Sequence, residues 1–311
     1  MARGQQMKAL ALLPAFALVG MTMACGAGGN GSGGTDAGSS QAPGGTESAP
    51  TAQKDAALAA LVPADIKADG KIVIGQDQTY PPNEFVENGK ATGFDVDLGT
   101  AVGQVLGVQT EFQNSAFDGI IPGISAKKYE MGISSFTINA ERMQTVDMIS
   151  YYSAGTSLAV LKGNPDKLSV DDLCGKNVAV QKGTTQVDDL GKRNTACTKA
   201  GKQPIDITQF QAQTDVNLAL TAKRVQAELA DSPVIDYAVK QTSGQLEAAG
   251  APYDTAPYGI VLPKGSGDFG KAVQGAVQKL IDTGIYKKIL DKWGLSGSGA
   301  ITKSEINPSA S

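Results

Sequence analysis

The stretch GFDVDLGTAVGQVLG, from Gly93 to Gly107, decides the fold class of this chain of 311 residues. From Asp95 to Leu106, apolar residues recur at spacings of three and four, which predicts an amphipathic helix with one buried face. A short segment lies on each side of it: the apolar run KIVIG, residues 71–75, and VQTEF, residues 108–112. We expect both runs to be strands, and the order strand, helix, strand is the unit of an α/β fold.

The same alternation continues toward the C-terminal part of the chain. Strands are expected over residues 131–135, 177–181, 205–210 and 225–230, and helices over 117–124, 186–200, 215–222, 233–241, 269–281 and 285–293. Alternating strands and helices predict an α/β fold with largely parallel sheets. Because this stretch is about 225 residues long and has a polar, cysteine-bearing middle section, we expect two lobes rather than one sheet.

The N-terminal residues have the composition of an export signal. Arg3 and Lys8 precede an apolar run that ends at Ala24 and is shorter than the roughly 20 residues needed to span a bilayer. A basic start, a short apolar run and a small residue at its end predict a secretory signal peptide over residues 1–24. The alternative, a buried helix, lacks both a cap and an amphipathic stripe.

Cys25 follows the apolar run directly, in a setting that resembles a bacterial lipobox, although Thr22 stands where an aliphatic residue is usual. Residues 26–53 contain no Val, Ile, Leu or aromatic residue and cannot form a core. We therefore expect a lipidated Cys25, a flexible tether over residues 25–70, and an extracytoplasmic protein anchored to the outer face of the cell membrane. The alternative is a secreted protein with one spare thiol. The Gly/Ser-rich tail, residues 295–311, is also expected to be flexible.

Cys174 and Cys197 are the other two cysteines. In an oxidising compartment they are expected to form a disulfide, which would close a loop of about 24 residues and contribute about 3 kcal/mol by the loop-entropy model. The alternative is two free thiols.

Composition excludes several classes of function. The chain has no histidine, which removes Ser-His-Asp triads, Cys-His dyads and His-ligated zinc. Its 27 basic and 31 acidic residues give a net charge of −4, and the basic residues are not clustered, so no nucleic-acid partner is expected. No cofactor and no metal are expected either.

The Gly93–Gly107 stretch resembles a signature of family 3 of the bacterial extracellular solute-binding proteins, the polar amino-acid receptors of ABC importers. Further blocks resemble the family in the family's order, over about residues 71–294. They are DQTYPP at 77–82, FDGIIPGISAKKYEMGISSFTINAER at 117–142, VAVQKGTTQ at 178–186, LADSP at 229–233, YGIVLPKG at 258–265 and IYKKILDKWG at 285–294. One departure is visible, because RVQAE at 224–228 replaces the usual Gly-x-x-Asp-Ala pattern before the acidic block.

The resemblance implies two α/β lobes joined by two crossing hinge strands. Lobe 1 would comprise residues 71–153 with 260–294, and lobe 2 residues 154–259. The implied function is capture of an L-amino acid by hinge closure and delivery to the permease subunits of an ABC transporter, by a protein expected to be a monomer and not an enzyme. An alternative is a periplasmic dehydratase, which resembles this family. A third alternative is a sensor module. We disfavour it because we expect no membrane span and no signalling domain after Trp293.

The resemblance also implies the binding residues. Arg142 would pair with the ligand carboxylate, because a guanidinium matches two oxygens, and backbone N–H groups at Thr137 and near Thr184 and Thr185 would complete that cradle. Asp231 would accept from the ligand ammonium, with Ser135 and Thr137 adding neutral oxygens. The alternatives are a surface arginine for Arg142, a helix N-cap for Asp231 and ordinary strand-end polarity for Ser135 and Thr137.

The ligand side chain would lie between Tyr80 and Phe117, although core packing is an equal alternative for Phe117. Asp77 matches the position that meets the distal group of the ligand. Lys182 and Glu84 lie nearby in the sequence, but their directions are open at this stage. A carboxylate at position 77 favours a polar or cationic amino acid over an acidic one.

Overall fold

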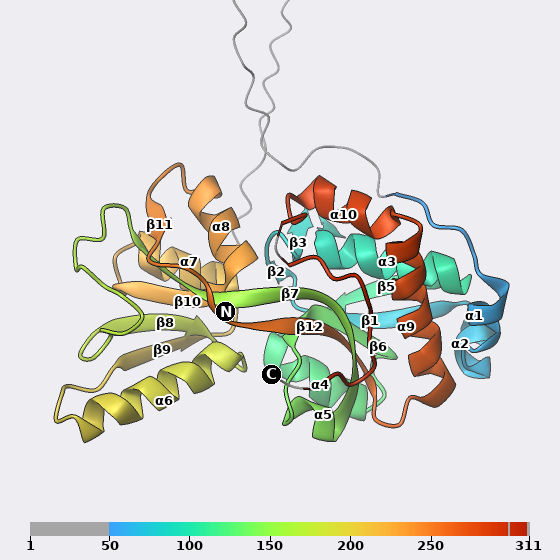
Figure 1. The fold of residues 1–311 in the computed structure, drawn as a ribbon, viewed down its shortest axis with the longest axis horizontal. Helices are drawn as coiled ribbons and strands as arrows, with labels where there is room; N and C mark the ends of the chain where they lie inside the picture. Colours follow the sequence, from blue (N-terminus) through green and yellow to red (C-terminus); the bar gives the residue numbers. More distant parts are fainter. Residues whose placement is uncertain (1–49, 298, 310–311) are drawn as a thin grey trace, which may run out of the picture. The chain divides into compact units, whose positions relative to one another are not determined.

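The computed structural model describes residues 50–297 and 299–309. The expected signal peptide, Cys25 and the tether up to residue 49 lie outside the described residues. Within them, two lobes are joined by two long strands, β7 and β12 (Figure 1). The two-lobed α/β class expected from the sequence is therefore confirmed.

A single path of paired strands runs through both lobes in the order β5-β1-β6-β12-β7-β10-β8-β9, with β11 on β7. The strands of this sheet are β1 (Lys71–Gln76), β5 (Gln109–Asn114), β6 (Met131–Thr137), β7 (Val146–Leu161), β8 (Asn177–Gln181), β9 (Asp206–Phe210), β10 (Ala227–Asp231), β11 (Leu246–Ala248) and β12 (Tyr253–Pro263). A separate small sheet contains β2 (Thr79–Tyr80), β3 (Glu84–Glu87) and β4 (Lys90–Thr92).

The helices cover the sheets. They are α1 (Ala56–Ala60), α2 (Ala64–Asp69), α3 (Phe94–Leu106), α4 (Phe117–Ser125), α5 (Arg142–Thr145), α6 (Thr185–Lys199), α7 (Gln213–Thr221), α8 (Ser232–Gln241), α9 (Gly267–Asp282) and α10 (Ile285–Trp293). The amphipathic helix predicted from the Gly93–Gly107 stretch is α3, and its apolar face packs in one core with α9 and α10. A second core under α4 completes the first lobe, and two further cores fill the second lobe.

The sheet is only partly parallel, so the expectation of largely parallel sheets needs correction. The outer pairs β1–β5, β1–β6, β8–β9 and β8–β10 are parallel, as helix crossovers require. The long strands β7 and β12 pair antiparallel with each other and with their neighbours. Each crosses from one lobe to the other, which a pattern of local periodicity does not reveal.

The tether expected over residues 25–70 ends earlier than predicted. Residues 56–69 form α1 and α2, and Ala52, Val62 and Ile66 are buried in the core of the first lobe. Asp55 caps α1 and its backbone N–H donates to the Val105 carbonyl of α3. This stretch contains apolar residues in sufficient number to join the core, so it belongs to the folded lobe.

The C-terminal tail was expected to be flexible, but its described residues pack on β7. The Ser150 N–H donates to the Glu305 carbonyl, the Asn307 N–H donates to the Met148 carbonyl, and Ile306 bridges to Ile149. Ser304 is buried. In the first lobe β7 pairs with β12 on one edge, and the tail covers the other edge. Backbone pairing with β7, rather than the Gly/Ser-rich composition, therefore determines the conformation of this segment.

The expected disulfide is confirmed: Cys174 and Cys197 are bonded, with their Cα atoms 5.6 Å apart. Cys197 lies at the C-terminal end of α6 and joins the core of the second lobe.

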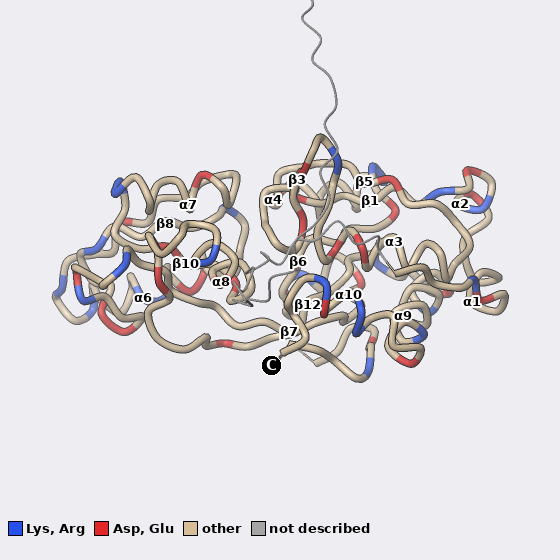
Figure 2. The backbone as a smooth tube through the Cα atoms, turned by 90° about the horizontal axis from the view of Figure 1, so that it is seen from above, with Lys and Arg blue, Asp and Glu red and all other residues tan. Residues whose placement is uncertain are grey.

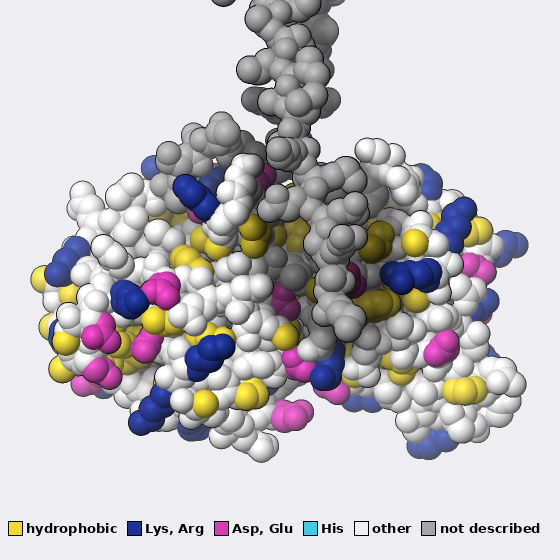
Figure 3. Space-filling view, turned by 180° about the vertical axis from the view of Figure 1, so that it is seen from behind, with side chains coloured by type: hydrophobic (Ala, Val, Ile, Leu, Met, Phe, Trp, Pro, Cys, Tyr) yellow, Lys and Arg dark blue, Asp and Glu magenta, His cyan; other side chains and the backbone are white. Residues whose placement is uncertain are grey.

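The positions of Lys, Arg, Asp and Glu are dispersed along the backbone of both lobes (Figure 2), and the face in Figure 3 likewise shows basic and acidic side chains intermixed. None of the helices in the described part of the chain is long and apolar enough to cross a membrane.

Candidate functional site

A cavity lined by residues of both lobes lies where the two lobes meet. All nine of the ligand-binding residues predicted from the sequence line it: Asp77, Tyr80, Phe117, Ser135, Thr137, Arg142, Thr184, Thr185 and Asp231. The prediction missed four further lining residues: Glu84, Ser134, Gln181 and Gln186. Each of these is adjacent to, or within a few residues of, a predicted one, and all four carry hydrogen-bonding side chains.

The lining residues gather because parallel strands end at this cavity. Asp77 follows β1, Gln181 ends β8 and Asp231 ends β10, so three side chains from three strand ends converge. In open α/β sheets, ligands bind at the carboxyl ends of the strands for this reason. Thr184 and Thr185 lie at the start of α6, directly after β8.

The small β2–β3–β4 sheet places Tyr80 and Glu84 at the cavity. A two-residue turn, Asn88–Gly89, joins β3 to β4, and both residues have left-handed backbone angles (φ 51° and 74°). Asn-Gly is the preferred pair for this hairpin turn because both positions need positive φ. The turn signal was present in the sequence and would have located this hairpin.

Gly93, the first residue of the deciding stretch, joins this hairpin to α3. Its φ is +129°, and an added Cβ would lie 2.1 Å from the Asn83 carbonyl oxygen. The Asp95 N–H donates to that same oxygen at 2.8 Å. Only glycine permits this approach, and the approach brings Glu84 next to Asp95.

Arg142 is the cation of the cavity and is partly buried. Its Nη1 donates to the Thr137 carbonyl at 2.8 Å and its Nη2 donates to the Gly183 carbonyl at 3.1 Å, and the guanidinium lies over the rings of Phe117 and Phe136. Among the described residues it forms no ion pair. Burial lowers its pKa to about 10, so it stays charged at neutral pH. A partly buried guanidinium without a counter-ion suits an anionic group.

The start of α6 lies beside Arg142. The first N–H groups of a helix have no partner within the helix and carry partial positive charge. The hydroxyls of Thr137 and Thr185 are 3.5 Å apart, and the Thr184 hydroxyl donates to the Gln181 carbonyl at 2.7 Å. These hydroxyls and amides add donors around the guanidinium, as a carboxylate requires.

Asp231 is the acidic group at the far side of the cavity. It occupies the N-cap position of α8, but its side chain forms no capping hydrogen bond. Instead its carboxylate accepts from Gln186 Nε2 and from the Tyr258 hydroxyl, both at 2.7 Å, and its N–H donates to the Tyr80 hydroxyl at 3.1 Å. Burial raises the pKa of this carboxyl. The alternative that Asp231 acts only as a helix N-cap is therefore not supported.

Asp77 is bound by the protein on both of its oxygens. Oδ1 accepts from the N–H and the hydroxyl of Thr79, and Oδ2 accepts from the Phe117 N–H and from Gln181 Nε2 at 2.7 Å. The last bond crosses from one lobe to the other. Asp77 thus holds the loop after β1 and contacts the second lobe, in addition to lining the cavity.

The directions of Lys182 and Glu84, left open by the sequence, differ. Lys182 forms an ion pair with Asp118 at 2.9 Å on the surface, so it does not compensate Asp77. Glu84 points inward, is 1% exposed, and accepts from the Ser134 hydroxyl at 2.8 Å. Ser135 lies at the same end of the cavity, where it accepts from Asn83 Nδ2.

Phe117 both packs in the core and lines the cavity, the two alternatives that the sequence left open. Its ring stacks on Phe136 with centroids 4.7 Å apart and belongs to the core under α4, and it also lines the cavity.

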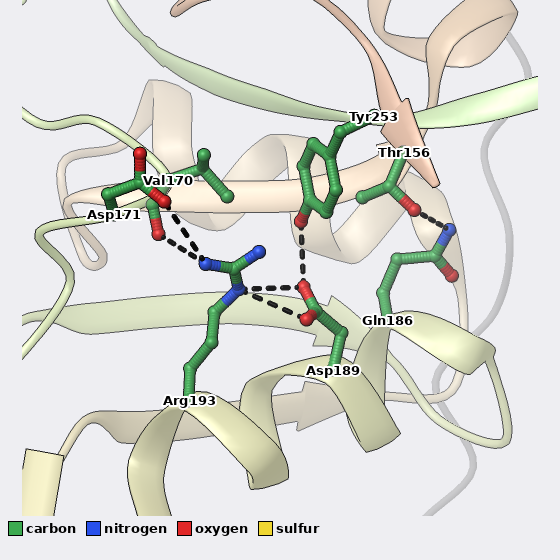
Figure 4. A network of polar contacts seen from close by, with 7 residues as sticks. All are labelled: Thr156, Val170, Asp171, Gln186, Asp189, Arg193 and Tyr253. Atoms are coloured by element: carbon green, nitrogen blue, oxygen red, sulfur yellow. Dashed lines mark hydrogen bonds and ion pairs between the residues drawn. The ribbon is translucent and has the colours of Figure 1, made fainter. Parts of the chain in front are cut away.

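A polar network ties α6 to the crossing strands (Figure 4). Asp189 accepts from Arg193 Nε at 2.9 Å and from the Tyr253 hydroxyl of β12 at 2.7 Å, and Gln186 Nε2 donates to the Thr156 hydroxyl of β7 at 3.1 Å. Helix α6 is therefore held to both strands that connect the lobes, and its first turn is fixed at the cavity.

The charges of the lining residues are unequal. Three carboxylic acids, Asp77, Glu84 and Asp231, face one guanidinium, Arg142. Two lobes, two crossing strands and a polar cavity at the carboxyl ends of strands define a two-lobed binding protein for a small charged ligand.

The chain belongs to the bacterial extracellular solute-binding proteins, family 3, whose family model matches residues 72–296. The arginine-binding protein ArgT of Corynebacterium glutamicum is 33% identical over 252 residues, which are 80% of this chain and 82% of that protein. The structure of an ancestral arginine-binding protein bound to arginine has a TM-score of 0.67 and 35% identity, over 72% of this chain and 98% of the other.

A third similarity bears on the enzyme alternative. The ancestral amino acid-binding protein AncCDT-1, a precursor of cyclohexadienyl dehydratase, has a TM-score of 0.67 and 31% identity, over 74% of this chain and 97% of the other.

Proposed function

We propose that this protein is the substrate-binding component of an ABC transporter and that it captures a cationic L-amino acid between its lobes. Arg142 and the start of α6 bind the ligand carboxylate, and Asp231 accepts from the ligand ammonium. The ligand side chain lies between Tyr80 and Phe117, and its distal group meets Glu84 and Asp77. The relatives and structural neighbours named for arginine support this choice of ligand.

One observation carries the proposal. A single guanidinium and three carboxylic acids face one cavity. An α-amino acid with a cationic side chain brings one carboxylate and two positive groups, which complements that arrangement. An acidic amino acid would add a second carboxylate to a cavity that already contains three acids, and burying like charges together is costly.

The proposal also covers the attachment of the protein to the membrane and the boundaries of its two lobes. Lipidated Cys25 anchors it to the outer face of the membrane, and the permease subunits receive the ligand. Residues 71–153 with 260–294, together with α1, α2 and the described tail, form one lobe, and residues 154–259 form the other. Closure bends β7 and β12 near Ala154 and Ala256, which pair with each other. If Cys25 is lipidated, Cys25→Ala should shift the protein from the membrane fraction to the medium or leave it uncleaved. An unchanged membrane fraction would contradict the anchor.

The binding proposal is tested with purified protein freed of ligand by unfolding and refolding. Calorimetry with arginine, lysine, histidine, glutamine and glutamate should rank the cationic ligands first and glutamate last. Mass spectrometry of ligand that co-purifies from the native protein identifies the physiological one. If none of these amino acids binds, the proposal fails.

The enzyme alternative is tested in the same experiment. Incubation with the amino acid that binds, and separately with cyclohexadienyl acids, should leave each compound unchanged by mass spectrometry. Loss of water from any of them would favour a dehydratase.

A further inference from the structure

Two buried carboxylic acids meet behind the cavity, and only one of them lines it. Glu84 of β3 is 1% exposed and lines the cavity, whereas Asp95 of α3 is 0% exposed and does not. Both approach the Ser135 hydroxyl, Glu84 Oε2 at 3.5 Å and Asp95 Oδ2 at 3.4 Å. The close approach of Gly93 to Asn83 brings the two acids together.

No positive side chain among the described residues pairs with either acid. The titratable groups that face them are Asp77 after β1, Tyr80 of β2 and Tyr151 of β7. None of these is cationic. Arg142, the cation of the cavity, donates to backbone carbonyls instead. Two ionised carboxylates cannot share a dry site without a cation, so the pair retains a proton.

The hydrogen bonds show which acid carries the charge. Asp95 Oδ2 accepts from the Ser135 N–H at 3.0 Å and from the Tyr151 hydroxyl at 2.9 Å, which favours the ionised form of Asp95. Ser135 has a left-handed backbone (φ 53°), which is costly for a residue other than glycine and is held in place by its N–H bond to Asp95. The proton is therefore on Glu84, whose pKa is raised well above its usual range by burial and by the charge of Asp95.

We propose that Asp95 is a positioning residue that keeps Glu84 protonated in the empty site, so that a ligand with a cationic side chain displaces one proton when it binds. The proposal rests on the proposed function. The step balances: the protonated Glu84 with ionised Asp95 and the ligand cation give ionised Glu84, ionised Asp95 and the bound cation, and one proton passes to solvent. A neutral side chain leaves the proton in place and accepts a hydrogen bond from it.

The consequence is selectivity by charge that depends on pH. Affinity for a cationic amino acid rises by up to tenfold per pH unit while the empty pair holds its proton, because one proton is released for each ligand bound. Affinity for a neutral ligand of the same shape stays flat. L-arginine and L-citrulline form such a matched pair, since they differ in a guanidinium and a ureido group.

The experiment measures proton release directly. Titration calorimetry of the full protein with L-arginine, in two buffers of different ionisation enthalpy at pH 6–7, should show release of about one proton per ligand. L-citrulline should show none. Because this comparison uses the wild-type protein, no variant needs to fold for the proposal to be overturned. Arginine that binds without proton release would overturn it while leaving the proposed function intact.

Variants of Glu84 and Asp95 test whether the released proton comes from this pair of acids. Asp95→Asn removes the charge that adds to the effect of burial on Glu84, so arginine should bind with less proton release and a shallower pH profile than in the wild-type protein. Glu84→Gln should abolish proton release and lower the ratio of arginine to citrulline affinity at least tenfold. Glu228→Gln, a buried acid of the second lobe outside the cavity, is the matched control and should release the proton as wild type does. Full proton release in Asp95→Asn would overturn the role of Asp95.

Discussion

At the scale of single residues, the cavity places its charges on opposite sides of the junction between the lobes. Arg142 begins α5, just after β6 of the first lobe, and Asp231 ends β10 of the second. In the proposed function the carboxylate and ammonium of one ligand bridge the two lobes. Because Asp231 is buried and Arg142 is partly buried, the loss of either would leave an opposite charge without compensation.

Removal of the Arg142 guanidinium should weaken binding of every amino acid. Loss of one partner of a buried, hydrogen-bonded charge pair costs about 2–5 kcal/mol, which corresponds to about 30-fold to several-thousand-fold in affinity. Calorimetry of Arg142→Ala measures this loss, and circular dichroism checks that the fold persists. Arg224→Ala, which removes an exposed guanidinium, is the control and should bind normally. Binding as tight as wild type in Arg142→Ala would remove the assignment of the carboxylate site.

Glu228 makes a second prediction, on stability. Its side chain is fully buried on β10, neither oxygen has a hydrogen-bond partner within the described part of the chain, and burial raises its pKa to about 8. Between pH 4.5 and 8 the unfolded chain binds fewer protons at this group than the folded one. The free energy of unfolding should therefore fall as pH rises through that window, by up to about 1.4 kcal/mol per pH unit.

Urea unfolding at pH 5, 6.5 and 8 measures this slope. Glu228→Gln removes the titrating group, so its stability relative to wild type should grow with pH. A difference between the two proteins that does not change with pH would show that Glu228 does not titrate in this range.

At the scale of elements, short connections decide where the lining residues lie. The Asn88–Gly89 turn closes the hairpin that positions Glu84, and the network of Asp189, Arg193 and Tyr253 fixes α6 against β12. At its other end α6 is joined by the Cys174–Cys197 disulfide to the segment before β8. The two ends of this helix therefore have separate tasks, one at the cavity and one in the lobe core.

Loss of the disulfide should destabilise the protein and leave binding intact. The loop-entropy model gives about 3 kcal/mol for a loop of this length. Thermal unfolding of the Cys174→Ala, Cys197→Ala double variant should show a clear decrease in midpoint, while calorimetry below the transition shows unchanged affinity. A large loss of affinity in the folded variant would mean that the disulfide also positions the first turn of α6.

At the scale of the whole molecule, two strands join the lobes and several side chains meet across the junction. Gln181 donates to Asp77, Arg142 donates to the Gly183 carbonyl, and Lys182 pairs with Asp118. Tyr80 and Phe85 of the first lobe also contact the second lobe, so separation of the lobes would break apolar as well as polar contacts while β7 and β12 remain intact. Opening and closing of this kind is the hinge motion by which two-lobed proteins enclose ligands.

Addition of ligand should make the protein more compact in solution. Small-angle scattering of the ligand-free protein and of the protein saturated with arginine should show a smaller radius of gyration with ligand. Gln181→Ala removes one contact between the lobes and should weaken affinity modestly without altering the charges of the cavity. The same radius of gyration in both states would argue against a closing mechanism.

The sequence by itself determined the local elements, and its resemblance to a family indicated residues that line the cavity. Periodicity located α3, α9 and α10 because one face of each helix must be buried, and it located β1, β6 and β8 because their apolar runs are short and bounded. All nine residues expected at the binding site do line one cavity. Their residue types and their neighbours in the chain indicated these positions, because polar side chains at strand ends and helix starts line the cavity.

Only the tertiary structure shows the features that depend on contacts between segments far apart in the sequence. The family resemblance implied two crossing strands, but the antiparallel pairing of β7 with β12 and the packing of the tail depend on pairing across about a hundred residues or more. Likewise, neither Glu84 nor Asp95 indicates by itself that it faces another acid. Their meeting follows from the approach of Gly93 to Asn83, and burial there, rather than residue type, sets the charge that each acid carries.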